Sequence, residues 1–124
     1  MTPLTILAVD DDPQMLTLIE RVTASHGHTL IKARSGEEAG LVIQGKVVDV
    51  VILDFMLEDE NARDVYDRLR GRLPKIPFIV LSAVPYASVQ PALEGLQFLA
   101  FLEKIHLVEE LPVLLASIAS RKSG

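Results

Sequence analysis

Short apolar runs alternate with amphipathic stretches along the whole chain, and this alternation most limits how it can fold. The runs have the length expected of strands that are covered on both faces. They lie at 4–9, 29–33, 47–53, 77–81 and 98–102. The run at 47–53 is the strongest, because it is β-branched throughout apart from Asp49 and Leu53. It predicts a central strand.

The stretches between the runs show helical spacing. After Asp12, which can serve as an N-cap, and Pro13, apolar residues recur at i, i+3, i+4 and i+7. This spacing predicts a first helix, which Gly27 ends. Ser35 and Glu38 stand three residues apart, as in a capping box, and predict a short second helix.

Two later stretches repeat the helical spacing. Residues 62–69 predict a third helix that reaches Gly71, and residues 111–118 predict a last helix with Pro112 near its start. Five strands that alternate with about five helices predict an α/β domain of three layers. We therefore expect a five-stranded parallel sheet with helices on both faces.

The segment at 83–97 is interrupted by two prolines, Pro85 and Pro91. Any fourth helix is therefore expected to be short, with Pro91 in its first turn and with Gly95 weakening it.

Composition limits the class of protein. With 49% hydrophobic and 23% charged residues, the chain suits one globular domain, expected at 1–120 with an exposed tail at 121–124. The absence of cysteine excludes a disulfide scaffold, a thiolate zinc site and a cysteine nucleophile. The net charge of −5 disfavours direct binding of nucleic acid. The short apolar start resembles neither a leader nor a membrane span, so we expect the cytoplasm.

Polar residues stand where the predicted strands end. Asp10 and Asp11 follow the first strand, Asp54 follows the third, Ser82 ends the fourth and Lys104 comes just after the fifth. In parallel sheets of this kind, ligands bind beyond the carboxyl ends of the strands. These side chains are therefore expected to meet at one edge of the sheet.

Three carboxylates at one edge repel each other, by on the order of 4 kcal/mol per pair at about 4 Å in an effective dielectric near 20. Lys104 supplies one positive charge, and a hard divalent ion, Mg²⁺, is the natural source of the rest. Such an ion also binds phosphate oxygens, to which Lys104 and Ser82 offer donors. Asp54 lies on the central strand and is best placed to accept a phosphoryl group as an acyl phosphate.

Three segments carry a resemblance to a known family. ILAVDDDP, DVVILDFML and IPFIVLSA, taken in this order, resemble the receiver domains of two-component response regulators, and the spacing from Ser82 to Lys104 fits as well. The resemblance covers nearly the whole chain. It implies a flavodoxin-like fold with strand order 2-1-3-4-5.

The resemblance also implies a chemistry. Asp54 would take a phosphoryl group from the phosphohistidine of a histidine kinase or histidine phosphotransfer protein, with Ser82 and Lys104 holding the phosphoryl oxygens. Mg²⁺ would be surrounded by Asp10, Asp11, Asp54 and the backbone carbonyl of Met56. The chain would then catalyse only its own phosphorylation and dephosphorylation, and would otherwise be no enzyme.

A switch follows from the same resemblance. Ser82 would move toward the phosphoryl group, and the aromatic residue of the fifth strand, Phe101, would rotate inward behind it. The fourth helix, fifth strand and fifth helix would then bind a downstream protein target or, as a homodimer, a second copy. No direct contact with nucleic acid or membrane is expected.

The chain departs from the family pattern mainly near this output face. Ile105 stands where a proline usually follows the lysine, which leaves the family's cis peptide open there. Gln97 and Phe98 replace a small pair, and Pro91 interrupts the fourth helix. Glu58 and Ala62 replace a frequent proline and glycine. An unusual fourth-helix and fifth-strand region is expected.

Two alternatives compete with the phosphorylated switch. A degenerate receiver that only binds partners or dimerises is compatible with Gln97, Phe98 and Ile105. A phosphohydrolase with an aspartate nucleophile would need a second acid at position 56, where this chain has Met56.

Other polar residues are expected to play structural parts. Asp12 is interpreted mainly as a helix cap, and His26 and His28 as residues at a helix end, not as metal ligands. Glu58, Asp59 and Glu60 are expected to form a solvated loop beside the site.

Overall fold

The protein, described here by a computed structural model over residues 2–123, is built on five parallel strands. The strands are β1 (Thr5–Val9), β2 (Thr29–Ala33), β3 (Val50–Asp54), β4 (Phe78–Ser82) and β5 (Ala100–Glu103). Their order in the sheet is β2-β1-β3-β4-β5, and every neighbouring pair is parallel. The expected topology is confirmed.

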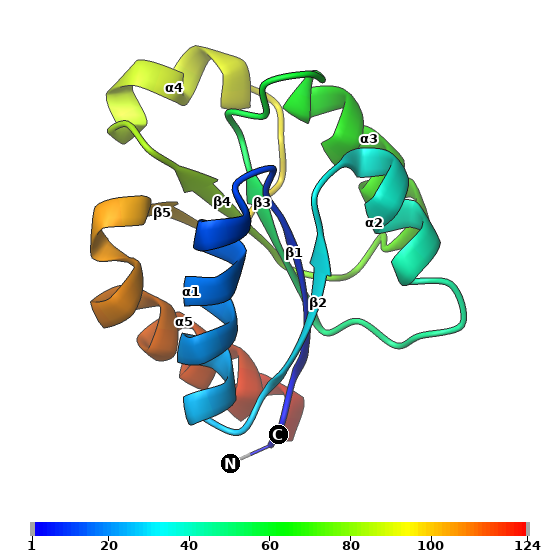
Figure 1. Cartoon of the computed structure of the whole chain (residues 1–124), viewed down its shortest axis with the longest axis vertical. Coiled ribbons are helices and arrows are strands. Elements are labelled where there is room, and N and C mark those ends of the chain that lie inside the picture. The colour runs from blue at the N-terminus through cyan, green and yellow to red at the C-terminus, as the bar shows by residue number, and fades with distance from the viewer. Residues whose placement is uncertain (1, 124) are drawn as a thin grey trace.

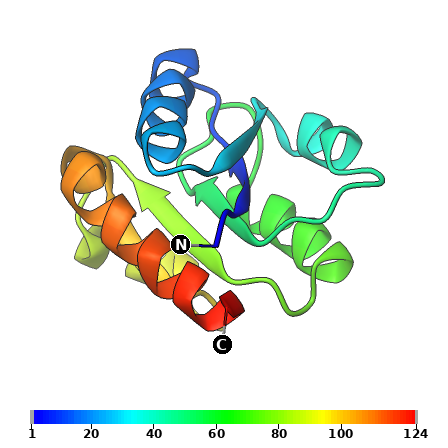
Figure 2. The same cartoon turned by 90° about the horizontal axis from the view of Figure 1, so that it is seen from below.

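The helices lie on both faces of this sheet (Figures 1 and 2). They are α1 (Pro13–Ser25), α2 (Gly36–Val42), α3 (Ala62–Arg72), α4 (Tyr86–Leu93) and α5 (Leu107–Ser123), and a 3-10 turn, η1 (Lys104–His106), precedes α5. Helices α1 and α5 cover one face, and α2 and α3 cover the other. Helix α4 lies beyond the carboxyl ends of the strands.

The two faces of the sheet produce two hydrophobic cores because successive side chains of a strand point to opposite sides. In β1, Ile6 and Ala8 join the core under α1 and α5, whereas Leu7 and Val9 join the core under α2 and α3. All residues of β3 are buried. The run predicted as the central strand is therefore central, and its end is held firmly in place.

The predicted caps position the first two helices. The Asp12 carboxylate accepts the Gln14 N–H at 2.9 Å, so Asp12 is the expected cap of α1. The Ser35 hydroxyl accepts the Glu38 N–H, and the Glu38 carboxylate accepts the Arg34 N–H, both at 3.1 Å. This reciprocal pair closes the start of α2 much as a capping box does.

Two strands begin two or more residues later than the sequence predicts. The expected strand at 47–53 starts only at Val50, and Val47 is 80% exposed. Because β1 begins at Thr5 and pairs Ile6 with Val50, residues before Asp49 extend past the end of the neighbouring strand. The last strand, expected at 98–102, is likewise shifted and spans Ala100–Glu103.

The connection that leads into β5 is bound to side chains of α3. The Tyr66 hydroxyl donates to the Gln97 carbonyl and accepts the Gln97 N–H, both at 2.9 Å. The Arg70 guanidinium donates to the same carbonyl at 2.8 Å and stacks 4.2 Å from the centre of the Phe78 ring. The backbone of Gln97 is therefore bound to helix side chains, and the Leu99 N–H makes a backbone hydrogen bond from this connection to β4, to the Phe78 carbonyl at 2.8 Å.

Two prolines, Pro91 and Pro112, lie deeper in their helices than predicted. Helix α4 begins after Pro85 and contains Pro91 near its end, so the expectation that Pro91 stands in the first turn is wrong. Helix α5 begins at Leu107, and Pro112 is its sixth residue. Each proline removes a single helical N–H, a loss that a short or well-packed helix can absorb. No cis peptide bond occurs among residues 2–123.

The end of α5 returns to the start of the sheet. Lys122 lies 3.1 Å from the Asp49 carboxylate, which also accepts the Thr5 N–H at 2.7 Å. Residues 121–123, expected in an exposed tail, continue the helix, and Arg121 and Lys122 are exposed as expected. No helix in the described part of the chain is long and apolar enough to cross a membrane.

His28 is buried at the opposite end of the sheet from the predicted site. The Nδ1 of His28 accepts the Leu4 N–H at 3.0 Å, so this nitrogen carries no proton and the ring is neutral. The buried Nε2 has no hydrogen-bond partner. Burial, and to a lesser degree the charge of His26, lower the pKa of His28 below its ordinary value of 6.5. The interpretation of His28 as a structural residue at the helix end agrees with these contacts.

The buried imidazole makes stability depend on pH. Because the folded-state pKa is lowered, the contribution of neutral His28 is complete above about pH 6.5 and is lost as the pH falls below it. We expect His28→Gln to cost about 1–3 kcal/mol of unfolding free energy at pH 7.5, and less at pH 5. Urea denaturation followed by circular dichroism measures this. The exposed control His106→Gln should show no such trend. If the loss of unfolding free energy in His28→Gln were the same at both pH values, buried neutral His28 would not be the cause.

Candidate functional site

Three of the predicted residues form one ionic cluster at the carboxyl edge of the sheet. Asp10 follows β1, Asp54 ends β3, and Lys104 follows β5. The Lys104 Nζ lies 3.0 Å from Asp10 Oδ2 and 3.1 Å from Asp54 Oδ2. Both carboxylates are buried. The amine is shared between them, as expected from strands that are parallel and close together.

Asp11 completes a set of acids. Carboxylate oxygens of Asp10, Asp11 and Asp54 all lie within 4.8 Å of one another. Asp11 is half-buried, and its Oδ2 accepts the Glu58 N–H at 2.8 Å. That hydrogen bond ties the loop after β3 to the loop after β1. The acids converge as predicted, and one of them also holds a neighbouring loop.

Burial and charge shift the pKa values of Asp10 and Lys104 in this cluster. Burial raises the pKa of Asp10 from 3.8 to about 6, although the Asp12 N–H opposes the rise. The buried Asp10 Oδ2 has the nearby charge of Lys104 but no hydrogen-bond partner. For Lys104, burial lowers the pKa, but Asp10 and Asp54 outweigh it and raise the pKa above its usual value. One cation against three carboxylates leaves a formal excess of negative charge.

Ser82 is brought to the same edge, but its hydroxyl does not contact the acids. It ends β4 beside β3 and is completely buried. Its Oγ donates to the Val84 carbonyl at 2.9 Å and accepts the Val84 N–H at 3.1 Å. The sequence predicted the position of Ser82 but could not predict this local turn.

Met56 and Phe101 lie close to the cluster in different ways. The Met56 N–H donates to Asp54 Oδ1 at 2.9 Å, and its thioether lies 3.8 Å from the Ser82 hydroxyl. Phe101 is half-buried in β5 and meets the ring of Tyr86 edge to face, with centres 5.2 Å apart. The Phe101 ring is therefore partly exposed and in contact with Tyr86.

Sequence reasoning missed the part that Glu60 plays beside the site. The Glu60 carboxylate accepts the Gly36 N–H with both oxygens, at 3.0 and 3.1 Å, and lies 3.6 Å from Arg68. The loop expected to be simply solvated is thus fastened to the first turn of α2. The sequence feature that could have indicated this contact is Gly36, because a Cβ at this position would crowd the Glu60 carboxylate.

A side chain at Gly36 should disturb this contact. A Cβ there would lie 2.6–2.8 Å from atoms of Arg68, Val65 and Glu60. We expect Gly36→Ala to lower the unfolding free energy by about 1–3 kcal/mol. The matched control, Gly40→Ala in the same helix, has only a 3.4 Å contact and should gain up to about 1 kcal/mol from helix propensity. Equal effects of the two substitutions in urea denaturation would contradict the close contact.

Comparison with known proteins gives a consistent result. The sequence profile of the response regulator receiver domain matches residues 6–104. The probable transcriptional regulatory protein TcrX of Mycobacterium tuberculosis is 33% identical over 81 residues, which are 65% of this chain and 35% of that protein. The transcriptional regulatory protein GlrR of Escherichia coli is 31% identical over 95 residues, or 77% of this chain and 21% of that protein. The chain therefore spans about a third or less of these relatives.

Solved structures share the fold. Chemotaxis protein CheY4 of Vibrio cholerae superposes with a TM-score of 0.83 at 20% identity, covering 93% of this chain and 98% of that one. Response regulator TrrA of Thermotoga maritima, in complex with Mg²⁺-BeF, gives 0.79 at 24% identity with coverages of 93% and 98%. NtrX of Brucella abortus gives 0.86 at 19% identity and covers 98% of this chain but 28% of that one.

Proposed function

This chain belongs to the response regulator receiver domain family, and on that premise we propose that it is a phosphorylation switch with Asp54 as the phosphoacceptor. The observation that carries the proposal is the shared contact of one lysine with two buried carboxylates at the ends of β1 and β3. A buried charge cluster of this kind is costly to maintain, and such sites are where function is expected.

The proposed step is a phosphoryl transfer to Asp54 from a phosphohistidine of a histidine kinase or histidine phosphotransfer protein. A bond forms between an Asp54 carboxylate oxygen and phosphorus as the phosphorus–nitrogen bond of the donor breaks, and the released imidazole takes up a proton. Lys104 already lies 3.1 Å from Asp54 Oδ2. Its charge would stabilise the negative oxygens of the transferred group.

Mg²⁺ fits the residues that are present. Carboxylates are the oxygen ligands that this ion takes from proteins, and three of them lie within 4.8 Å here. The buried Asp10 oxygen that lacks a hydrogen-bond partner could serve as one of the ligands. Asp10, Asp11, Asp54 and the Met56 carbonyl would hold the ion, which would supply positive charge for the phosphoryl oxygens. The related fold of TrrA was solved with Mg²⁺-BeF, which is compatible with this assignment.

The switch would act through Ser82 and Phe101. The Ser82 hydroxyl must release the Val84 carbonyl to donate to a phosphoryl oxygen, and the loop after β4 would change its arrangement. A dianion that binds one arrangement better shifts the population toward it. Phe101 would rotate inward, and the surface of α4, β5 and α5 would bind a downstream protein in the cytoplasm.

Intact-mass measurement tests the proposal. The protein is incubated with Mg²⁺ and a small acyl phosphate donor. We expect one phosphoryl adduct that is labile to base, that requires Mg²⁺ and that is absent from Asp54→Asn. Asp12→Asn serves as the control, because asparagine caps a helix as well as aspartate does, and it should keep the adduct. No adduct with any donor would favour the alternative, an unphosphorylated receiver that works as a binding module.

A further inference from the structure

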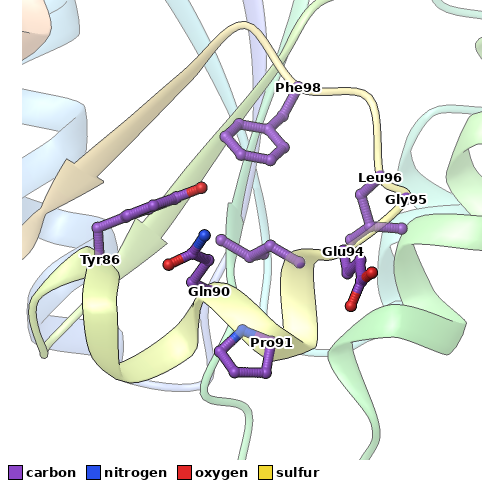
Figure 3. A pocket seen from close by; sticks show the side chains of 8 residues that line it. Tyr86, Gln90, Pro91, Glu94, Gly95, Leu96 and Phe98 are labelled. Carbon is purple, nitrogen blue, oxygen red and sulfur yellow. The ribbon is translucent and has the colours of Figure 1, made fainter.

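Two hollows lie on different parts of the surface. One, of about 530 Å³, lies beside α4 between Tyr86 and Phe98 (Figure 3) and adjoins the surface that the proposed switch would use. Another, of about 430 Å³, lies between α2 and α3, on the face of the sheet that these helices cover (Figures 1 and 2). We call it the α2–α3 groove. No step of the proposed phosphorylation uses it.

The α2–α3 groove offers apolar contact and an open wall. It is lined by Leu69 of α3, which is buried, and by Leu41 of α2, which is 60% exposed. Gly36 and Gly40 stand one helical turn apart on the α2 side, and because glycine has no side chain, this wall consists of backbone. An aliphatic side chain of a ligand can therefore enter the groove and pack against leucine.

Two arginines form the α3 wall of the groove. The Arg72 Nη1 donates to the Gly40 carbonyl at 2.8 Å, and the Arg68 side chain is 60% exposed and lies 3.6 Å from the Glu60 carboxylate. Neither arginine makes another hydrogen bond or ion pair within residues 2–123. A guanidinium carries several N–H donors in a planar fork, so most donors of both arginines remain available to a ligand.

A third arginine of the same helix has a structural part that Arg68 and Arg72 lack. The Arg70 guanidinium donates to four backbone carbonyls, those of Leu73, Pro74, Ile76 and Gln97. Those bonds fasten the segments that lead into β4 and β5. The contacts of Arg68 and Arg72 are too few to explain two exposed cations beside an apolar hollow in the same way.

The charge of the groove is opposite to that of the whole chain. Its lining contains two arginines and one glutamate, Glu37, whereas the chain has a net charge of −5. Glu60 does not neutralise the arginines further, because both of its oxygens already accept the Gly36 N–H. Carboxylates of a ligand are the matching partners, since arginine binds them with two parallel hydrogen bonds.

We propose that the α2–α3 groove binds a short acidic segment of a partner protein in extended conformation. Acids at i and i+2 of such a segment lie on one side, about 6–7 Å apart. Arg68 and Arg72 stand at i and i+4 of a helix, about 5–6 Å apart, so two acids in this spacing reach both arginines. The residue between the acids points to the opposite wall, where an aliphatic side chain meets Leu41. This binding does not depend on phosphorylation.

Two other occupants match the groove less well. A second copy in a twofold contact would place the arginines of both copies against each other, which is unfavourable. Inorganic phosphate would pair with the arginines but leave Leu41 uncovered. Both occupants are distinguishable from an acidic segment by experiment.

Three designed peptides of about eight residues, long enough to cross the groove when extended, test the proposal. The first has Glu-Leu-Glu at its centre, with serine and glycine around it. The second has Lys-Leu-Lys and the third has Glu-Ser-Glu at the same place. Binding to the full chain is followed by two-dimensional NMR, with sodium phosphate as a separate titrant and with a dilution series of the protein alone.

We expect the Glu-Leu-Glu peptide to shift the backbone signals of Gly40, Leu41 and Arg72, with affinity that falls as salt is added. The Lys-Leu-Lys peptide should not bind. The Glu-Ser-Glu peptide should bind about two- to fivefold more weakly, because it lacks the aliphatic contact. No shift by the Glu-Leu-Glu peptide at millimolar concentration would overturn the proposal.

Variants with matched controls test the charge of the groove. Arg68→Gln/Arg72→Gln should weaken binding of the Glu-Leu-Glu peptide by roughly tenfold. Arg21→Gln/Arg121→Gln removes the same charge from exposed positions of α1 and α5, on the other face of the sheet, and should leave binding unchanged. Equal weakening by both double variants would mean that overall charge, and not the groove, attracts the peptide.

A second pair of variants tests the shape of the groove. A Cβ at Gly40 would lie 3.4 Å from the Arg72 guanidinium, whereas a Cβ at Gly71 would meet nothing within 4 Å. Gly40→Leu should therefore fill the groove and abolish binding with every charge in place, and Gly71→Leu should not. Unchanged binding to Gly40→Leu would overturn the proposal. Shifts of the same signals by phosphate as strong as those by the peptide, or on concentrating the protein alone, would overturn it in favour of a free anion or a second copy.

The fold of each variant is checked in the same spectra. All exchanged side chains except Gly40 are exposed, so the dispersion of the signals should be preserved. Binding that follows both the charge of the arginines and the space beside Gly40 would support the groove as a site for acidic segments, whether or not Asp54 accepts a phosphoryl group.

Discussion

Replacing Asp10 with asparagine is expected to stabilise the metal-free protein at pH 8 and to abolish its response to Mg²⁺. Asp10 is completely buried, and its pKa is raised to about 6 from 3.8. A rise of this size corresponds to about 3 kcal/mol that the folded state loses as the carboxyl ionises. The loss begins as the pH rises above about 3.8 and is complete above about 6.

Asparagine cannot ionise, so Asp10→Asn avoids this loss. Its side-chain oxygen can still accept the Asp12 N–H, as Asp10 Oδ1 does at 2.9 Å. The variant gives up the attraction of Lys104, so the expected net gain is about 1–2 kcal/mol at pH 8 and near zero at pH 4. Urea denaturation in EDTA at both pH values measures it.

The response to Mg²⁺ is the second half of this prediction. A ligand at a hundred times its Kd stabilises a protein by about 2.7 kcal/mol. Wild-type protein should show a gain of this kind, and Asp10→Asn should not, because one of the proposed ligands has lost its charge. Asp12→Asn makes the same change two residues away at an exposed cap and should behave as wild type. A variant that is less stable than wild type at pH 8 would refute the account.

The outcome for the fold shows what sequence patterns can predict. Short apolar runs that alternate with amphipathic stretches were sufficient to predict five parallel strands, because a strand with helices on both sides is apolar along most of its length. The patterns failed where side chains from another element decide the backbone. Tyr66 and Arg70 bind the backbone of Gln97 just before β5, and no local feature of residues 97–99 predicts these contacts. Val47 was wrongly placed in the third strand because the neighbouring β1 begins only at Thr5, which lies opposite Asp49.

The site was predictable in position but not in hydrogen bonding. The carboxyl ends of parallel strands meet at one edge, so the convergence of Asp10, Asp54 and Lys104 followed from strand order alone. The Ser82 hydroxyl and the Glu60 carboxylate have more than one acceptor or donor within reach. Their choice depends on the conformation of loops, which the sequence does not specify by periodicity.

Removing the lysine should have the opposite effect to removing the acid. Lys104→Met leaves the carboxylates of Asp10 and Asp54 buried with no cation between them. We expect it to cost about 2–4 kcal/mol of unfolding free energy at pH 8 in EDTA, and less at pH 5, where Asp10 takes up a proton. Mg²⁺ should restore part of the loss. Lys122→Met breaks a more exposed ion pair with Asp49 and should cost no more than about 1 kcal/mol.

The double variant Asp10→Asn/Lys104→Met tests whether these groups act as one unit. Once Asp10 is neutral, Lys104 stabilises the folded state less, because only the Asp54 carboxylate then needs a counter-charge. The double variant should therefore be more stable than the sum of the single effects by about 1 kcal/mol or more at pH 8. At pH 4.5 this coupling should shrink, since Asp10 is already protonated in the wild-type protein. Coupling that is absent at pH 8, or unchanged between the two pH values, would mean that the cluster is not held together by charge.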